Sequence, residues 1–149
     1  MDQPLRGQKA LVTGASSGIG EGIARALGAA GAAVVVNYAG NAAGAARVVA
    51  DLNAGGAEAL AIRADVAREA DVEAMFGEML AAWGRIDILV NNSGVQRDAA
   101  LTEMTLDQWT TVLGVNLTGM FLCTRAAARA MIGQGRREGS RCEAPTSDL

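Results

Sequence analysis

A glycine-rich turn near the start of the chain constrains the fold more than any other feature. Residues 9–13 form a short apolar run, and Gly14, Gly18 and Gly20 follow it in the spacing G-x-x-x-G-x-G, with a helical pattern beginning at Ile19. A strand, a tight turn and a helix in this order expose backbone N–H groups, which a ligand can approach where no Cβ intervenes. The positive end of the helix dipole favours an anion there. The turn therefore predicts a site for the pyrophosphate of a dinucleotide.

Strand and helix patterns alternate along the rest of the chain. Strands are expected over 9–13, 33–37, 58–62 and 86–90, and helices over 19–30, 45–52, 72–83 and 105–131, the last with a break near Gly114. Apolar residues recur every three or four positions in the helices, and the run at 33–37 is continuously apolar, as in strands covered on both faces. Short connections with right-handed crossovers then predict an α/β fold: a Rossmann-type, doubly wound parallel sheet with strand order 3-2-1-4 and a ligand site beside the first strand.

Composition narrows the classes of function. The 149 residues suffice for one domain, and the net charge of -3 argues against a nucleic-acid partner, which calls for a basic face. No apolar run reaches the length of about 18 residues that a membrane span needs. The first strand begins by residue 9, which leaves no room for a signal peptide, so we expect a cytoplasmic protein. The chain has no histidine, which excludes an imidazole base or ligand, and no metal site is expected.

The end of the chain differs from the rest. Residues 133–149 are rich in glycine and arginine and have no apolar period. We therefore expect one nucleotide-binding domain over 1–132 and a disordered or aberrant tail over 133–149.

Four motifs occur together in a specific order. They are TGASSGIG at 13–20, Asp65-Val66 after the third strand, NNSG at 91–94 and VNLTG at 115–119. Over residues 7 to about 132 the chain resembles the N-terminal portion of members of the short-chain dehydrogenase/reductase family. Within that family Asn37-Tyr38 and residues 95–98 look most like glucose 1-dehydrogenases, with bacterial 3-oxoacyl-[acyl-carrier-protein] reductases close behind.

The resemblance implies a cofactor site assembled from four segments. Its residues are Gly14, Ser16, Ser17, Gly18, Ile19 and Gly20 in the turn, Asn37 and Tyr38 after the second strand, Asp65 and Val66 after the third, and Asn92, Ser93 and Gly94 after the fourth. Asp65 would accept a hydrogen bond from the adenine amino group, and Asn91 would tie the fourth strand to the Thr13 turn. The alternatives are a glycine turn without a ligand, a helix-capping Asp65 and plain turn-forming asparagines.

The same resemblance assigns a catalytic role to Asn116, which in the family bends a helix and holds a water of the proton relay. The family's other catalytic residues are a Ser and a Tyr-x-x-x-Lys pair. The chain's only tyrosine is Tyr38 and its only lysine is Lys9, so it has no such pair, and carbonyl reduction needs a proton donor. In this chain Asn116 is therefore expected only to bend its helix.

Two hypotheses about function follow. The first is an NAD(P)-dependent oxidoreductase lineage that acts on a sugar, with glucose leading, or on another secondary alcohol or ketone. The second hypothesis is a non-catalytic dinucleotide-binding fragment, left by a truncation or frameshift before the fifth strand. We favour it for the 149 residues considered on their own. An unpaired edge on the fourth strand predicts a marginal, aggregation-prone fold, and the helix over 105–131 is expected to support homo-oligomers.

The end of the second strand bears on the choice of cofactor. An NAD-specific site usually has a carboxylate there for the ribose 2′-OH, whereas this chain has Asn37-Tyr38-Ala39. No acid repels a 2′-phosphate, no arginine stands at position 39 to attract one, and Arg47 is too far along its helix to assume that it helps. We therefore predict use of both cofactors, with a preference for NADP.

Overall fold

The fold is a parallel sheet between two layers of helices. A computed structural model describes residues 2–137. Its strands are β1 (Lys9–Val12), β2 (Ala33–Tyr38), β3 (Ala59–Arg63) and β4 (Ile88–Val90), all parallel, in the order β3-β2-β1-β4. The predicted fold class and strand order are confirmed.

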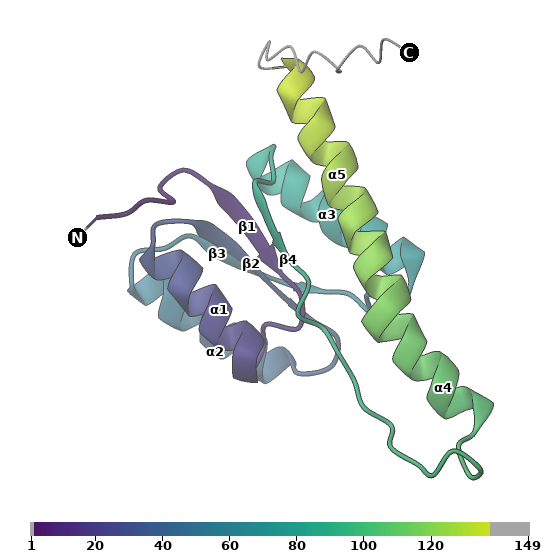
Figure 1. Cartoon of the computed structure of the whole chain (residues 1–149). Coiled ribbons are helices and arrows are strands. Elements are labelled where there is room, and N and C mark those ends of the chain that lie inside the picture. Colours follow the sequence, from purple (N-terminus) through teal and green to yellow (C-terminus); the bar gives the residue numbers. More distant parts are fainter. Residues whose placement is uncertain (1, 138–149) are drawn as a thin grey trace, which may run out of the picture.

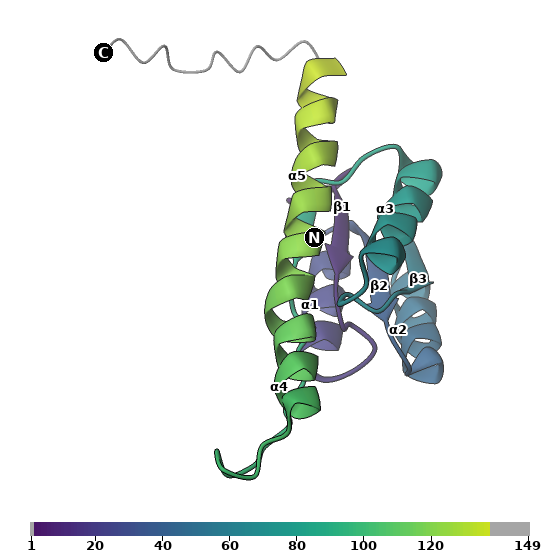
Figure 2. The same cartoon turned by 90° about the vertical axis from the view of Figure 1, so that its right-hand side faces the viewer.

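The helices lie on both faces of this sheet. They are α1 (Gly18–Ala29), α2 (Ala42–Ala54), α3 (Glu69–Trp83), α4 (Leu106–Leu113), the π-helical turn η1 (Gly114–Thr118) and α5 (Gly119–Arg137). Helices α1 and α2 cover one face, and α3 and α5 cover the other (Figures 1 and 2). Alternate strand residues supply the two cores: Leu11 and Val35 pack towards α3 and α5, while Val12 and Val36 pack towards α1 and α2.

Local sequence explains the helix boundaries. Thr105 Oγ1 accepts from the Gln108 backbone N–H at 3.1 Å, and Gln108 Oε1 accepts from the Thr105 N–H at 2.8 Å, so α4 begins with the predicted capping box. Gly84 ends α3 in the left-handed conformation, at a φ of 71°. Near Gly114 the helix does not break; it widens into the π-helical η1 and continues as α5.

The C-terminal part of α5 departs from expectation. Residues 133–137, predicted to be disordered, are helical, and residues 138–149 of the predicted tail lie outside the described residues. The Gln134 amide reaches Ile86, where Oε1 accepts from the backbone N–H and Nε2 donates to the carbonyl oxygen, both at 2.9 Å. Gln134 thus pairs both backbone groups of Ile86, and β4 begins at Ile88, two residues later than the predicted strand at 86–90.

An apolar stripe is exposed along α4, η1 and α5. Leu106, Trp109, Leu117 and Phe121 lie at helical spacing and are each more than half exposed. Association through this region stays a prediction. Among the described residues β4 has a strand on one side only, and the expected marginal stability is also untested.

Candidate functional site

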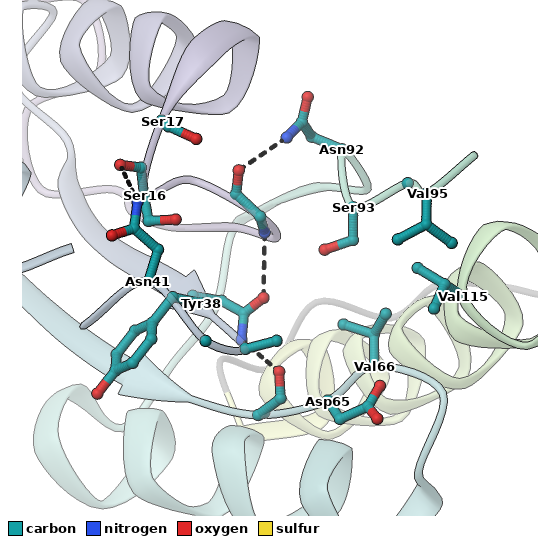
Figure 3. A pocket seen from close by; sticks show the side chains of 16 residues that line it. Ser16, Ser17, Tyr38, Asn41, Asp65, Val66, Asn92, Ser93, Val95 and Val115 are labelled. Atoms are coloured by element: carbon teal, nitrogen blue, oxygen red, sulfur yellow. Dashed lines mark hydrogen bonds between the residues drawn. The ribbon is translucent and has the colours of Figure 1, made fainter. Parts of the chain in front are cut away.

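A cavity of about 320 Å³ opens at the carboxyl ends of the strands (Figure 3). Its wall is formed by the turns that follow all four strands, with a contribution from η1. The lining residues are Gly14, Ser16, Ser17, Asn37, Tyr38, Ala39, Gly40, Asn41, Ala64, Asp65, Val66, Asn92, Ser93, Gly94, Val95 and Val115. The position, beside β1 where the strand order reverses, is where open α/β sheets bind ligands.

Most of the residues expected from the sequence come together here. Ten line the cavity: Gly14, Ser16, Ser17, Asn37, Tyr38, Asp65, Val66, Asn92, Ser93 and Gly94. Gly18, Ile19, Gly20 and Asn116 do not line it. Ala39, considered above for the choice of cofactor, also lines the cavity. The sequence interpretation missed Gly40, Asn41, Ala64, Val95 and Val115, small or aliphatic residues for the most part, whose chemistry gives no local signal.

The turns after β1 and β4 are joined by hydrogen bonds. The buried Thr13 Oγ1 accepts from the backbone N–H groups of Asn92 and Ser93, at 2.9 and 3.0 Å. Asn92 Nδ2 donates to the carbonyl oxygens of Thr13 and Gly14, at 3.0 and 3.1 Å. The expectation that Asn91 makes this tie is wrong, since Asn91 Nδ2 instead donates to Thr124 Oγ1 on α5. Asn92 makes the tie instead, because both its backbone N–H and its Nδ2 reach the Thr13–Gly14 segment.

Asn37 holds the next pair of turns. It is buried, its Oδ1 accepts from the Gly14 N–H at 3.1 Å, and its Nδ2 donates to the carbonyl oxygens of Ile62 and Ala64 at 3.3 and 3.2 Å. Both amide hydrogens are therefore used within the protein. Asn37 shapes the cavity wall and has no donor left for a ligand.

The three turn glycines meet different requirements. Gly14 and Gly18 adopt left-handed conformations, with φ of 61° and 58°, which residues with a Cβ adopt only at a cost. A Cβ on Gly20 would lie 2.4 Å from both Asn92 Nδ2 and the Gly14 carbonyl oxygen. Gly20 thus allows α1 to pack against the two turns and does not itself face the cavity.

The N-terminus of α1 lacks a side-chain cap. The N-cap Ser17 makes no side-chain hydrogen bond to the first turn, whereas Asn41 caps α2 by accepting from the Gly44 N–H at 3.0 Å. The first N–H groups of a helix have no partner within the helix. At α1 these donors remain available beside Ser17, at the edge of the cavity.

Glu21, in the first turn of α1, would repel an anion if it were unpaired. Arg47 of α2 binds it through two hydrogen bonds of 2.7 and 2.8 Å, and Arg25 binds it from one turn away. Hydrogen bonds from Arg47 and Arg25 lower the pKa of Glu21 to about 2. The carboxylate thus stays ionised with its charge offset, so the positive end of the helix remains suited to phosphate.

Asp65 and Val66 form the wall beside β3. Val66 is buried, and one oxygen of Asp65, Oδ1, accepts from the Ala67 N–H at 3.0 Å. Figure 3 shows Asp65 and Val66 on the side of the cavity opposite Ser17 and Asn92. Asp65 therefore caps a local turn and does not cap α3, whose N-cap is Arg68, so the helix-capping alternative is wrong. The other carboxylate oxygen of Asp65 can still accept from a ligand.

Asn116 lies in η1 and ties it to the β4 loop. Its Oδ1 accepts from the Val95 N–H at 2.8 Å and its Nδ2 donates to the Val95 carbonyl oxygen at 3.0 Å. This pair fixes the loop next to Gly94 while the helix is locally widened. The polar groups of Asn116 are thus paired with loop backbone, and the expectation that Asn116 only bends its helix stays a prediction.

Tyr38 and Lys9 are far from forming a catalytic pair. Lys9 is the first residue of β1 and Tyr38 the last of the neighbouring parallel strand β2, so they lie at opposite ends of the sheet. Lys9 Nζ is 3.1 Å from Glu58 Oε2 and contacts the Trp83 ring. This arrangement offers no proton donor of the Tyr-x-x-x-Lys kind at the cavity.

Residues 2–137 contain neither a membrane-spanning helix nor a cluster of metal-ligating side chains. None of the helices described there has the length and apolar character needed to cross a membrane. The same residues contain no group of three or more His, Cys, Asp or Glu side chains placed to hold a metal ion.

Comparison with known proteins decides the family. Residues 8–140 match the family model described as short chain dehydrogenase, which covers most of the chain. The chain belongs to the short-chain dehydrogenase family. The resemblance seen in the motifs is thereby confirmed at the level of the family.

Individual relatives within the short-chain dehydrogenases add detail. The chain is 48% identical over 130 residues to a 3-oxoacyl-[acyl-carrier-protein] reductase of Synechocystis sp., covering 87% of this chain and 53% of the relative. A reductase of the same name from Staphylococcus aureus is 43% identical over 127 residues, covering 85% of this chain and 52% of the relative. These names match the second activity that the resemblance suggested, not the glucose 1-dehydrogenases that were placed first.

Solved short-chain dehydrogenases share the fold. A Burkholderia cenocepacia enzyme in complex with NADP matches with a TM-score of 0.83 and 42% identity, covering 85% of this chain and 52% of that one. A Mycobacterium marinum enzyme matches with a TM-score of 0.84 and 40% identity, covering 88% and 53%. The chain spans about half the length of the relatives it matches.

Proposed function

We propose that this chain is the dinucleotide-binding part of an NAD(P)-dependent oxidoreductase. The observation that carries the proposal is the cavity at the carboxyl ends of β1, β2, β3 and β4, bordered by the uncapped N-terminus of α1. Family membership and a solved relative in complex with NADP support the same assignment.

The residues around the cavity suit the parts of a dinucleotide. The N–H groups at the start of α1 would bind the pyrophosphate. The space around the Cα of Gly18 is open, since a Cβ built there meets no atom within 4 Å, so a phosphate can approach the backbone closely. Asp65 would accept from the adenine amino group, and Val66 would pack against the ring. Ser93, across the cavity from Ser16 (Figure 3), and the neighbouring Gly94 would lie along the adenosine ribose. When bound, the cofactor supplies the hydride.

For the substrate we propose a 3-oxoacyl thioester, reduced at its ketone. This proposal rests on the named relatives from Synechocystis sp. and Staphylococcus aureus. Glucose, suggested by the resemblance at Asn37-Tyr38 and residues 95–98, is the weaker candidate, since both relatives named above are 3-oxoacyl-[acyl-carrier-protein] reductases.

The 149-residue chain alone is proposed to bind cofactor without turnover. Hydride delivery to a ketone leaves an alkoxide that needs a proton, and Tyr38 and Lys9 lie at opposite sheet ends. Asn116 would then serve only to position the loop at Val95.

Titration of NADH and NADPH fluorescence with the purified chain tests binding. We expect saturable binding of at least one dinucleotide and no oxidation of NADPH by a 3-oxoacyl thioester. Absence of binding to both would refute the proposed function, and turnover would refute the missing proton donor.

Matched glycine variants locate the pyrophosphate. Gly18→Ala and Gly56→Ala place a Cβ on left-handed residues, with φ of 58° and 88°, and in both cases the Cβ meets nothing within 4 Å. The backbone strain is therefore comparable, but only Gly18 is at the α1 N-terminus. Alanine keeps the backbone N–H, but its Cβ would hold the pyrophosphate away from the N–H groups at the start of α1. We therefore expect Gly18→Ala to weaken dinucleotide binding about 10-fold or more, and Gly56→Ala to leave it unchanged.

A further inference from the structure

A second cavity adjoins the proposed nucleotide site. It has a volume of about 490 Å³ and is lined by Ala39, Arg63, Asp65, Arg68, Asp71 and Ala74. Ala39 and Asp65 also line the first cavity, so the two are neighbours across the ends of β2 and β3. A ligand in the first cavity that carries an additional group near Ala39 would extend that group towards the second.

The arginines of this region differ in how far their charges are engaged. Arg47 and Arg25 are paired with carboxylates of α1 and α2, namely Glu21 and Asp51. Arg68 Nε lies 3.7 Å from Asp71 Oδ1. Within residues 2–137 Arg63 has no carboxylate partner, and its recorded hydrogen bond runs from Nε to the Ala39 carbonyl oxygen, at 3.1 Å.

That hydrogen bond orients the Arg63 side chain. Arg63 is the last residue of β3 and is aligned with Tyr38 at the end of β2. With Nε bound to Ala39, the guanidinium is held against the turn after β2, and no residue of the described chain binds its terminal nitrogens. A planar fork of this kind matches two oxygens of a phosphate group.

The ribose 2′-substituent of a bound dinucleotide is read at the end of the second strand. Here Tyr38, Ala39 and Gly40 offer no carboxylate to a 2′-OH and no cation to a 2′-phosphate. Arg63 is the cation anchored to this segment, although it comes from the neighbouring strand and lies 24 residues further along the chain.

We propose that Arg63 binds the 2′-phosphate of NADP and thereby makes this site prefer NADP to NAD. The inference rests on the proposed function, since it assumes a dinucleotide in the first cavity. Two carboxylates also line the second cavity, but Asp71 Oδ2 accepts from the Asp65 N–H at 3.0 Å, and Asp65 Oδ1 accepts from the Ala67 N–H. With these oxygens engaged by backbone donors and Arg68 near Asp71, Arg63 is the group left to attract a phosphate.

The test compares Arg63→Gln with Arg68→Gln, a neutralised arginine on the wall of the same cavity. Dissociation constants for NADPH and NADH are measured by fluorescence titration of the purified chain, and competition by 2′,5′-ADP is compared with competition by 5′-AMP. We expect Arg63→Gln to weaken NADPH and 2′,5′-ADP about 10-fold or more and to change NADH and 5′-AMP less than about 2-fold. Arg68→Gln is expected to leave all four within about 2-fold.

The outcomes separate the two proposals. Equal weakening of both dinucleotides by Arg63→Gln would mean that Arg63 acts only through Ala39 as a structural residue, and no weakening would mean that it takes no part; either result overturns the inference and leaves dinucleotide binding intact. Failure of the unmodified chain to bind NADH and NADPH overturns the proposed function together with the inference. Arg63→Lys, which keeps the charge but lacks the fork, should retain part of the NADPH preference.

Discussion

Replacing Gly20 by alanine tests how closely α1 must pack against the two turns beside the cavity. The new Cβ would lie 2.4 Å from the Gly14 carbonyl oxygen and 2.4 Å from Asn92 Nδ2. The first neighbour is backbone and the second is held by two hydrogen bonds, so neither can move without loss. Overpacking of this kind costs about 1–3 kcal/mol, against a gain in helix propensity of about 1 kcal/mol for Gly→Ala.

Gly22→Ala is the matched control. Gly22 lies in the same helix, and its Cβ would meet nothing within 4 Å. Gly22→Ala therefore gains helix propensity without any steric clash, and it should be about 0.5–1 kcal/mol more stable than the unmodified chain. Gly20→Ala should be about 1–2 kcal/mol less stable, because lost Asn92 hydrogen bonds add to the overpacking.

Urea unfolding followed by far-UV circular dichroism measures both free energies of unfolding. The slope against urea should be the same for the two variants, since they expose the same surface on unfolding. If Gly20→Ala proves as stable as Gly22→Ala, the close approach of α1 to Gly14 and Asn92 is not real, and the packing role assigned to Gly20 is wrong.

Three further perturbations test other contacts. Thr13→Val removes the acceptor for the Asn92 and Ser93 N–H groups and should lower the free energy of unfolding by about 1–3 kcal/mol. Thr13→Ser keeps the hydroxyl and should retain most of this stability. If urea titrations show the same loss of stability for both variants, the role of the hydroxyl is wrong. The pKa of Glu21 falls from 4.5 to about 2 on folding, so the stability that its ion pairs contribute is complete above pH 4.5 and is lost as the pH falls towards 2. In thermal melts over this pH range, Glu21→Gln should remove the corresponding decline of stability with falling pH. The same pH dependence in both proteins would count against the pairing of Glu21 with Arg47. Gln134→Met should cost about 1–3 kcal/mol, since the Ile86 N–H and carbonyl lose their partner, and an unaltered urea midpoint would show that the end of α5 does not hold the start of β4.

Local patterns in the sequence predicted the fold well. Apolar runs and helical periods set the element order, and the rules for parallel crossovers then leave few topologies, so β3-β2-β1-β4 followed. The same logic placed the turns after the strands on one edge of the sheet, which is why most of the expected site residues line one cavity.

The missed features depend on partners that are distant in the chain. Whether Asn91 or Asn92 faces Thr13 depends on the course of the backbone after β4 ends at Val90. Gln134 has the sequence context of an irregular tail, and its pairing with Ile86 is visible only in the folded structure. Asn37 has the chemistry of a ligand-binding residue, yet its amide is hydrogen-bonded to three backbone groups, one in the turn after β1 and two at the end of β3. Such hydrogen bonds form only when distant segments pack together, and the hydrophobic periodicity of the sequence does not predict them.

The contacts between Thr13 and Asn92 span 79 residues. A partly folded chain that has formed the first β-α-β unit but has not yet docked its fourth strand would possess only half of the cavity wall. Nucleotide affinity would then arise late in folding, after the slow closure of this long loop. A ligand present at about 100 times its dissociation constant would add about 2.7 kcal/mol to the stability of the fully folded state. The partly folded chain, with an incomplete cavity, would not gain this stability, so bound cofactor would increase the fraction of fully folded molecules.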